Sequence, residues 1–230
     1  NKIIFLFVSS FSLLTLALIL VLLYPGAFVE YKVDVHFLQL NQTLTEVLFE
    51  NVTKVYDNGT FSYNLTVYAL NYSVIVGTGI VYDNLTCPSS FFYLPNVGNS
   101  TTNRIVPLTL ISANNGIYIY MGIQYIDYVE IKYFYYVNSS GVPYKIVILQ
   151  IGENGEPVSN TTYTLIASNI INHEEIPILP KGFKFAKGIK VSLSSGINDS
   201  LNETIGSYIL PLTIIFALVL LGARKFAKKV

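Results

Sequence analysis

Apolar and polar residues alternate with a period of two through much of the middle of the chain. Residues 29–37 alternate strictly over nine positions, and residues 61–67 repeat the pattern. This spacing is typical of strands with one buried face, because successive side chains point to opposite sides of a sheet. The apolar side of the first segment consists of Val29, Tyr31, Val33, Val35 and Phe37. We expect these side chains to lie in the core.

Further runs rich in β-branched and aromatic residues continue this pattern. They are Tyr72–Val76, Ile80–Tyr82, Ile105–Ile111, Ile117–Tyr125, Tyr128–Val137, Tyr144–Ile151, Tyr163–Ala167 and Ile189–Leu193. Clusters of Gly, Asn, Ser and Pro separate them, as turns between strands require. About ten short strands separated by such turns predict a mainly β protein, either an antiparallel sandwich or a barrel. We favour an antiparallel β-sandwich over residues 28–193. Only Leu44–Phe49 is ambiguous between a helix and a strand.

Two long apolar runs flank this region. Ile3–Leu23 comprises 21 residues without a charge or a proline, and Ile205–Ala223 comprises 19 residues. At 1.5 Å per residue, either run as a helix would cross the ~30 Å hydrocarbon layer of a membrane. The alternative for the first run is a cleaved signal peptide. We favour a retained anchor, because the run is longer than a signal core and no good small-residue cleavage site follows it.

Basic residues indicate the orientation of these two helices. Lys2 precedes the first run, and Arg224, Lys225, Lys228 and Lys229 follow the second. Since Lys and Arg concentrate on the cytoplasmic side of membranes, both termini should be inside the cell. The expected organisation is a transmembrane anchor (1–24), an extracellular β domain (28–193), a glycosylated polar stalk (194–204), a second anchor (205–223) and a basic cytoplasmic tail (224–230).

Asn-x-Ser/Thr sequons are dense between the two apolar runs. The eleven asparagines are Asn41, Asn51, Asn58, Asn64, Asn71, Asn84, Asn99, Asn138, Asn160, Asn198 and Asn202. So short a motif also arises by chance in a chain rich in Asn, Ser and Thr, which accounts for some of them. Their confinement to the expected outside still favours N-glycosylation. A glycosylated asparagine must lie on a loop or at an outward strand position, because a glycan cannot be buried.

Composition and charge narrow the function classes. Hydrophobic residues make up 52% of the chain and charged residues only 12%, well below the ~25% typical of soluble domains. Nine Lys and Arg residues lie between the apolar runs, against all 14 Asp and Glu residues. An acidic middle does not suit nucleic acid, which requires a basic face. Cys87 is the only cysteine, so the fold cannot depend on an intrachain disulfide.

The residues that could bind copper do not have the spacing of a copper site. A cupredoxin-like centre would need Cys87, His36, His173 and Met121, but neither His nor Met follows Cys87 closely. His173 with the next two glutamates reads as a solvated loop, because adjacent side chains on an extended segment do not converge on one ion. We therefore expect no metal site and no bound cofactor other than N-linked glycans.

No catalytic signature is present either. Gly77-Thr78-Gly79 lacks the third glycine and the helix of a nucleotide-binding loop, so a bulge or a close strand crossing explains it better. With two histidines and no Gly-x-Ser-x-Gly motif, a catalytic triad is not expected. We therefore expect that the protein is not an enzyme.

Four lysines at intervals of three form a local basic patch. They are Lys181, Lys184, Lys187 and Lys190. The patch could contact an acidic partner or lipid headgroups. We favour an exposed loop and edge strand, on which lysines prevent pairing with other chains.

In its overall composition the chain resembles the surface proteins of hot-acid crenarchaea such as the Sulfolobales. The shared features are a high content of Ile, Tyr and Asn, few charged residues, no disulfide, many sequons and a short basic tail. The resemblance implies an outer face at low pH and assigns no residue a role. The expected function is a non-catalytic, glycosylated accessory or structural subunit of a membrane or cell-envelope assembly. Its partners would be membrane lipids and other membrane or envelope proteins, in a hetero- or homo-oligomer. The alternatives are an envelope or spike protein of an archaeal virus and a subunit of an extracytoplasmic redox or transport complex.

Overall fold

The computed structural model describes residues 23–88, 92–95, 97–103, 105–185 and 192–194. The strands are β1 (Phe28–Phe37), β2 (Gln42–Val55), β3 (Thr60–Ala69), β4 (Val74–Asn84), β5 (Thr101–Thr102), β6 (Pro107–Asn114), β7 (Ile117–Ile126), β8 (Val129–Asn138), β9 (Pro143–Ile151), β10 (Pro157–Ser168), β11 (Lys184–Phe185) and β12 (Ser192–Ser194). Short 3₁₀ turns, η1 (Leu38–Leu40) and η2 (Leu70–Tyr72), connect β1 to β2 and β3 to β4. The expectation of a mainly β protein is confirmed.

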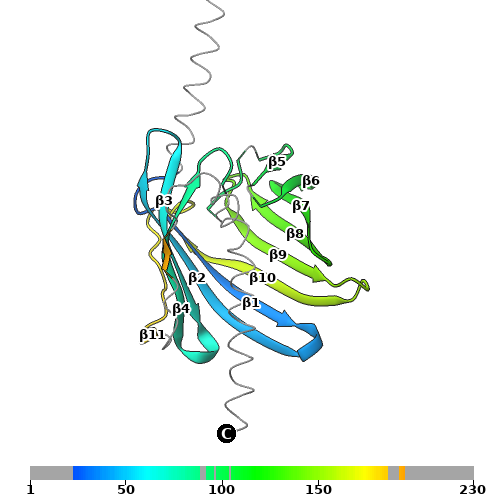
Figure 1. The fold of residues 1–230 in the computed structure, drawn as a ribbon. Helices are drawn as coiled ribbons and strands as arrows, with labels where there is room; N and C mark the ends of the chain where they lie inside the picture. Colours follow the sequence, from blue (N-terminus) through cyan, green and yellow to red (C-terminus); the bar gives the residue numbers. More distant parts are fainter. Residues whose placement is uncertain (1–22, 89–91, 96, 104, 186–191, 195–230) are drawn as a thin grey trace, which may run out of the picture.

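The strands form one continuous sheet in the order β11-β4-β3-β2-β1-β10-β9-β8-β7-β6-β5, with β12 also paired to β4. Strands β1–β4 and β6–β10 are two antiparallel meanders, and the antiparallel pair β1–β10 joins them. Figure 1 shows the sheet strongly curved, with the two meanders rising on either side of β1 and β10. The expected sandwich of two stacked sheets is therefore wrong. The hydrogen bonds between β1 and β10 make the two halves a single sheet, which encloses its core by bending.

The core lies on the inner, concave face of this sheet. Val29, Tyr31, Val33, Val35 and Phe37 of β1 are all buried there, so the predicted register of this strand is confirmed. The connection from β4 to β5 packs over the same face. The Phe92 ring in this connection meets the rings of Phe61 and Tyr63 nearly at right angles, with centroids 5.8 and 5.3 Å away. The Leu94 amide donates a 2.8 Å hydrogen bond to the carbonyl of Gly141, beyond the far end of β8.

Several predicted segments differ in detail from the observed strands. The ambiguous segment Leu44–Phe49 lies within β2, and the two runs predicted around residues 72–82 form the single strand β4. Opposite Gly77, the β3–β4 register shifts between Val67 and Tyr68, and β12 runs beside residues 78–80. Of the bulge or close strand crossing expected for this glycine pair, the bulge is therefore present.

Part of the outer face is covered by residues 169–185, which we call the strap. The strap leaves the end of β10, crosses β1 and β3, and ends as β11 beside β4. In the strap, the Ile178 amide donates a 2.7 Å hydrogen bond to Oε2 of Glu30, and the Phe183 ring packs edge-on against Tyr68. Glu30 points outward, as the alternation predicts, yet it is fully buried because the strap covers it.

Within the described part of the chain, no helix is long and apolar enough to span a membrane. Both expected anchors, most of the expected stalk, Asn198, Asn202, Lys187 and Lys190 lie outside the described residues. The expectation of two flanking helices therefore stays a prediction.

Candidate functional site

The chain joins the sheet and leaves it at the same end. One cross-strand row runs from Phe28 through Asn51, Asn64 and Ile80 to Ser194. Strand β12 runs parallel to β4 and therefore in the direction opposite to β1. The chain thus enters β1 and leaves β12 on the same side of this row. With four strand spacings of about 4.8 Å, the two points lie at most about 19 Å apart. We call this edge of the sheet the Phe28 end.

None of the nine described sequon asparagines is buried. Asn41, Asn58, Asn64, Asn71 and Asn99 are exposed, and Asn51, Asn84, Asn138 and Asn160 are half-buried. Asn51 and Asn64 are direct cross-strand neighbours on the outer face of β2 and β3. Five of the asparagines are therefore open to solvent, whereas Oδ1 of Asn51 and of Asn160 is buried without a hydrogen-bond partner among the described residues. Occupancy of the sequons stays a prediction.

Three sequons form the same local turn. In the first, Oδ1 of Asn58 accepts hydrogen bonds from the backbone N and from Oγ1 of Thr60, at 3.1 and 2.7 Å. The Asn84 amide carbonyl is bound in the same way by Thr86, at 2.8 and 2.7 Å. Asn138 has the equivalent contacts with the backbone and hydroxyl of the serine two residues on. Such turns hold the carbonyl oxygen toward the backbone, which orients the Nδ2 atom, the glycan acceptor, away from it.

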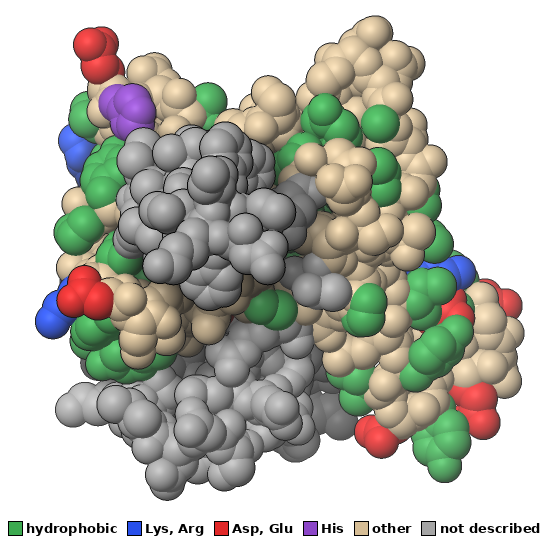
Figure 2. Space-filling view, turned by 90° about the horizontal axis from the view of Figure 1, so that it is seen from above, with side chains coloured by type: hydrophobic (Ala, Val, Ile, Leu, Met, Phe, Trp, Pro, Cys, Tyr) green, Lys and Arg blue, Asp and Glu red, His purple; other side chains and the backbone are tan. Residues whose placement is uncertain are grey.

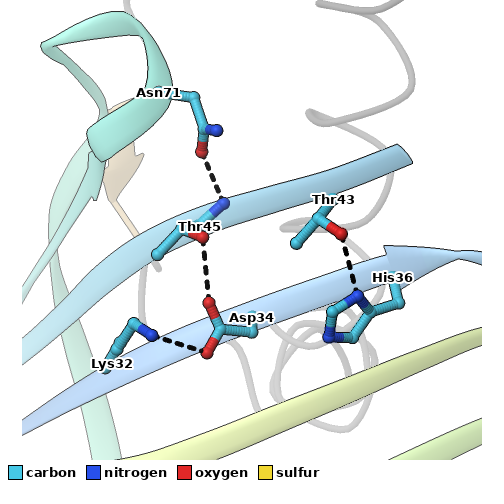
Figure 3. A network of polar contacts seen from close by, with 6 residues as sticks. All are labelled: Lys32, Asp34, His36, Thr43, Thr45 and Asn71. Carbon is cyan, nitrogen blue, oxygen red and sulfur yellow. Dashed lines mark hydrogen bonds and ion pairs between the residues drawn. The ribbon is translucent and has the colours of Figure 1, made fainter. Parts of the chain in front are cut away.

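Other sequon residues take part in a polar network on the outer face of β1 and β2 (Figure 3). Oδ1 of Asn71 accepts a 2.6 Å hydrogen bond from the backbone N of Thr45, and the Thr45 hydroxyl donates to Asp34 at 2.9 Å. Asp34 also pairs with Lys32 at 2.9 Å. The outer face of β1 and β2 is therefore polar around Asp34 and Thr45, the part that the strap does not cover.

Three carboxyl groups are buried on the inner face, at separate positions on β2 and β4. Glu46, Glu50 and Asp83 are each at most 2% exposed. Burial raises the pKa of the Glu46 carboxyl to about 8, and its Oε2 atom has no hydrogen-bond partner among the described residues. Burial also raises the pKa of Glu30 beneath the strap, while the hydrogen bond from Ile178 opposes that rise. The sequence reading missed these groups, although Glu46 and Glu50 occupy apolar positions in the alternation of β2.

Buried tyrosines lie near two of these carboxyls: Tyr31 and Tyr63 near Glu50, and Tyr63 and Tyr93 near Asp83. Six of the described tyrosines are at most 2% exposed: Tyr31, Tyr63, Tyr120, Tyr133, Tyr135 and Tyr163. Burial raises the pKa of Tyr133 to about 12 and also raises the pKa of Tyr31 and Tyr135. The Tyr31 hydroxyl donates to the Pro143 carbonyl at 2.6 Å, and the Asn103 amide donates to the Tyr135 hydroxyl at 3.0 Å. Phenols with raised pKa values stay protonated, so the Tyr31 and Tyr135 hydroxyls are neutral hydrogen-bonding groups, whereas the buried Tyr63 hydroxyl has no hydrogen-bond partner among the described residues.

The four residues considered for copper lie on separate elements. His36 is at the end of β1, bonded through Nδ1 to the Thr43 hydroxyl at 2.8 Å. Met121 is on β7, and Cys87 follows β4. His173 is in the strap, with Nδ1 3.4 Å from the Tyr24 hydroxyl. No group of three metal-binding side chains occurs among the described residues.

The described lysines of the basic patch lie beside an edge strand. Lys181 is exposed in the strap, and the exposed Lys184 begins β11, the short outer neighbour of β4. This position agrees with the interpretation of these lysines as protection of a sheet edge.

Comparisons with known proteins give no further assignment: no protein-family model and no curated protein matches the chain.

Proposed function

We propose that the chain is a non-catalytic, glycosylated accessory or structural subunit of a membrane or cell-envelope assembly. The β domain would be displayed on the outer face, held by helices formed from residues 3–23 and 205–223. The observation that carries this proposal is that the chain joins and leaves the sheet at the Phe28 end. If both chain termini are cytoplasmic, both helices must cross the same membrane, which lies on one side of the β domain. The chain must then enter and leave the domain on that side.

Two further observations support the proposal. The described sequon asparagines lie on turns and outward strand positions, where glycans can be accommodated. The buried Glu46 carboxyl, with a pKa of about 8, is neutral at low pH. It would therefore not destabilise the folded protein at an acidic outer surface.

The test is the location and modification of the full-length protein in its native membranes. Carbonate washing should leave the protein in the membrane, and external protease should cleave the β domain but spare both tails. Glycopeptide mass spectrometry should find glycans at Asn58, Asn84 or Asn138. A protein released by carbonate, or one without a glycan at any sequon, would contradict the proposal.

Isolation of the intact assembly in mild detergent then identifies its class. A cell-envelope lattice or a stoichiometric membrane complex supports the accessory role. Recovery in virions would instead identify an envelope or spike protein, and co-purified redox or transport subunits would identify the other alternative.

A further inference from the structure

Glu30 is an acid on the outer face of the sheet that solvent does not reach. Its side chain is 0% exposed, whereas Asp34, further along the same face of β1, is half-buried and pairs with Lys32. The strap causes this difference, because the Ile178 amide lies over Glu30 and donates the 2.7 Å hydrogen bond to Oε2. The other carboxyl oxygen, Oε1, is buried and has no hydrogen-bond partner among the described residues. Within the described part of the chain, a single backbone donor therefore replaces the water around this carboxyl.

Apolar side chains flank Glu30 beneath the strap. Phe49 of β2 is its direct cross-strand neighbour, and the Phe49 ring lies 5.8 Å from the ring of Phe28, measured between centroids. Phe28 and Val47, which share the outer face, are at most 5% exposed. Ala167, the neighbour of Glu30 on β10, is also buried. Strap and sheet therefore enclose a small second core on the outer face, and this core contains a carboxyl group.

Among the described residues, no free cation faces Glu30. From the strap the nearby charge is Glu175, a second acid, and from β3 the nearby ionisable group is the Tyr68 phenol. On β1 itself, Lys32 pairs with Asp34 at 2.9 Å. Charged side chains are also sparse over the surface shown in Figure 2, as expected for a chain with 12% charged residues. The other ionisable side chains of the strap are exposed to solvent: His173, Glu174, Lys181 and Lys184.

The middle of the strap has few other contacts with the sheet. At the start of the strap, Oδ1 of Asn169 accepts a 2.8 Å hydrogen bond from the Phe28 amide, and at its end the Phe183 ring packs against β3. Between these points, the side chains of Ile176 and Ile178 are 74% and 67% exposed, so they point away from the sheet. The backbone hydrogen bond from Ile178 to the buried carboxyl is therefore the polar contact that fixes the middle of the strap.

We propose that Glu30 and the strap form a pH-sensitive latch, in which protonated Glu30 holds the middle of the strap on the sheet and ionised Glu30 releases it. Beneath the strap the carboxyl loses its water, and this loss costs far more for the charged form than for the neutral form. Once the strap is released, water returns and the charge is no longer penalised. The pKa of Glu30 agrees with this direction: burial raises it, the Ile178 hydrogen bond opposes the rise, and the charge of Glu175 adds to it.

The sign of the pH effect follows from the two states of the strap. Below the ordinary pKa of 4.5, Glu30 is protonated whether the strap is docked or released, so docking is strongest there. As the pH rises above this value, the released state loses the proton first, and release becomes more favourable. Each unit by which docking raises the pKa multiplies the equilibrium constant for release about tenfold. Release uncovers the apolar residues beneath the strap, so the latch exposes an apolar surface as the pH rises.

The test is hydrogen exchange of the full-length protein in mild detergent at pH 4 and pH 7. The exchange rate of residues 178–185 is divided into that of a free peptide of the same sequence, and this ratio, the protection factor, removes the pH dependence of the exchange chemistry. We expect the protection factor of residues 178–185 to fall several-fold from pH 4 to pH 7. Amides of β8 should keep a much higher protection factor at both pH values, which shows that the strap opens while the sheet stays folded.

Two substitutions assign the effect to Glu30. Glu30→Gln cannot ionise, so its protection factor should be the same at both pH values, whatever its absolute size. Glu174→Gln, which removes an exposed acid of the strap, is the matched control and should show the same fall as the unmodified protein. If the glutamine variant does not fold, Glu30→Leu, which suits the apolar surroundings and also cannot ionise, gives the same test.

Three results would overturn the latch. The first is a protection factor of residues 178–185 that does not change with pH in the unmodified protein. The second is a protection factor that rises with pH, because ionised Glu30 would then hold the strap. The third is a fall that persists in full in the variants without an acid at position 30. None of these measurements depends on whether the chain is anchored in a membrane, so failure of the proposed function is a separate result.

Discussion

Replacement of Glu46 by glutamine should remove a large part of the pH dependence of stability. Glu46 lies on the inner face of β2, opposite Val33 of β1 and Ala69 of β3, and is 1% exposed. Burial raises its pKa from 4.5 to about 8. The folded protein therefore holds a proton on Glu46 over a pH range in which the unfolded chain has released it.

The sign and size of the effect follow from this difference. Below pH 4.5 the carboxyl is protonated in both states, so Glu46 does not destabilise the fold. As the pH rises from 4.5 to about 8, the unfolded state loses the proton first and the free energy of unfolding falls. Each pKa unit corresponds to about 1.4 kcal/mol, which gives a maximum loss of about 5 kcal/mol above pH 8. Glu46→Gln has no charge to bury and should avoid this loss.

The assay is denaturant unfolding of the full-length protein in mild detergent at pH 4 and pH 8. Glu46→Gln should match the unmodified protein at pH 4 and exceed its stability by several kcal/mol at pH 8. Glu156→Gln, in the exposed turn between β9 and β10, is the matched control and should follow the unmodified protein at both pH values. An equal difference between Glu46→Gln and the unmodified protein at both pH values would refute the reasoning.

Two further substitutions test the packing of the core by the same unfolding measurement. A Cβ on Gly122 would lie 2.7 Å from Cγ1 of Val106, so Gly122→Ala should destabilise the protein by about 1–3 kcal/mol. Gly77→Ala, with nothing within 4 Å of the new atom, should be neutral or slightly stabilising; equal losses for both would contradict the packing. Phe92→Ala should cost about 3–5 kcal/mol, because Phe92 is fully buried against Tyr63. A loss below about 1 kcal/mol would show that the β4–β5 connection does not close the core.

Local features of the fold could be predicted from the sequence, whereas its long-range contacts could not. Alternation of side chains correctly gave the strands and the buried face of β1, because it depends on neighbouring residues alone. Pairing of β1 with β10 joins Val33 to Tyr163, which are 130 positions apart, and no local pattern encodes it. That pairing decides between one curved sheet and a sandwich.

Buried acidic residues account for the other differences between the predicted and the observed structure. Glu46 and Glu50 stand at inward positions of β2 and interrupt its apolar alternation, which made this strand ambiguous. Glu30 was correctly placed on the outer face, but its burial depends on the strap, which reaches it through Ile178 from the far end of the chain. Carboxyl groups can occupy such positions when they remain protonated or receive a backbone hydrogen bond. A hydropathy pattern cannot show whether either condition is met.

The outer face of the sheet differs between its two halves in the residues that it presents. Asn51 and Asn64 lie on β2 and β3, in the half whose outward residues are polar and which the strap partly covers. The outward positions of β8 and β9 include Phe134 and Val147 instead, and the sequon residue Asn160 of β10 lies directly opposite Leu149. Glycans and protein contacts exclude one another on a surface, because a bound sugar keeps another protein from approaching closely.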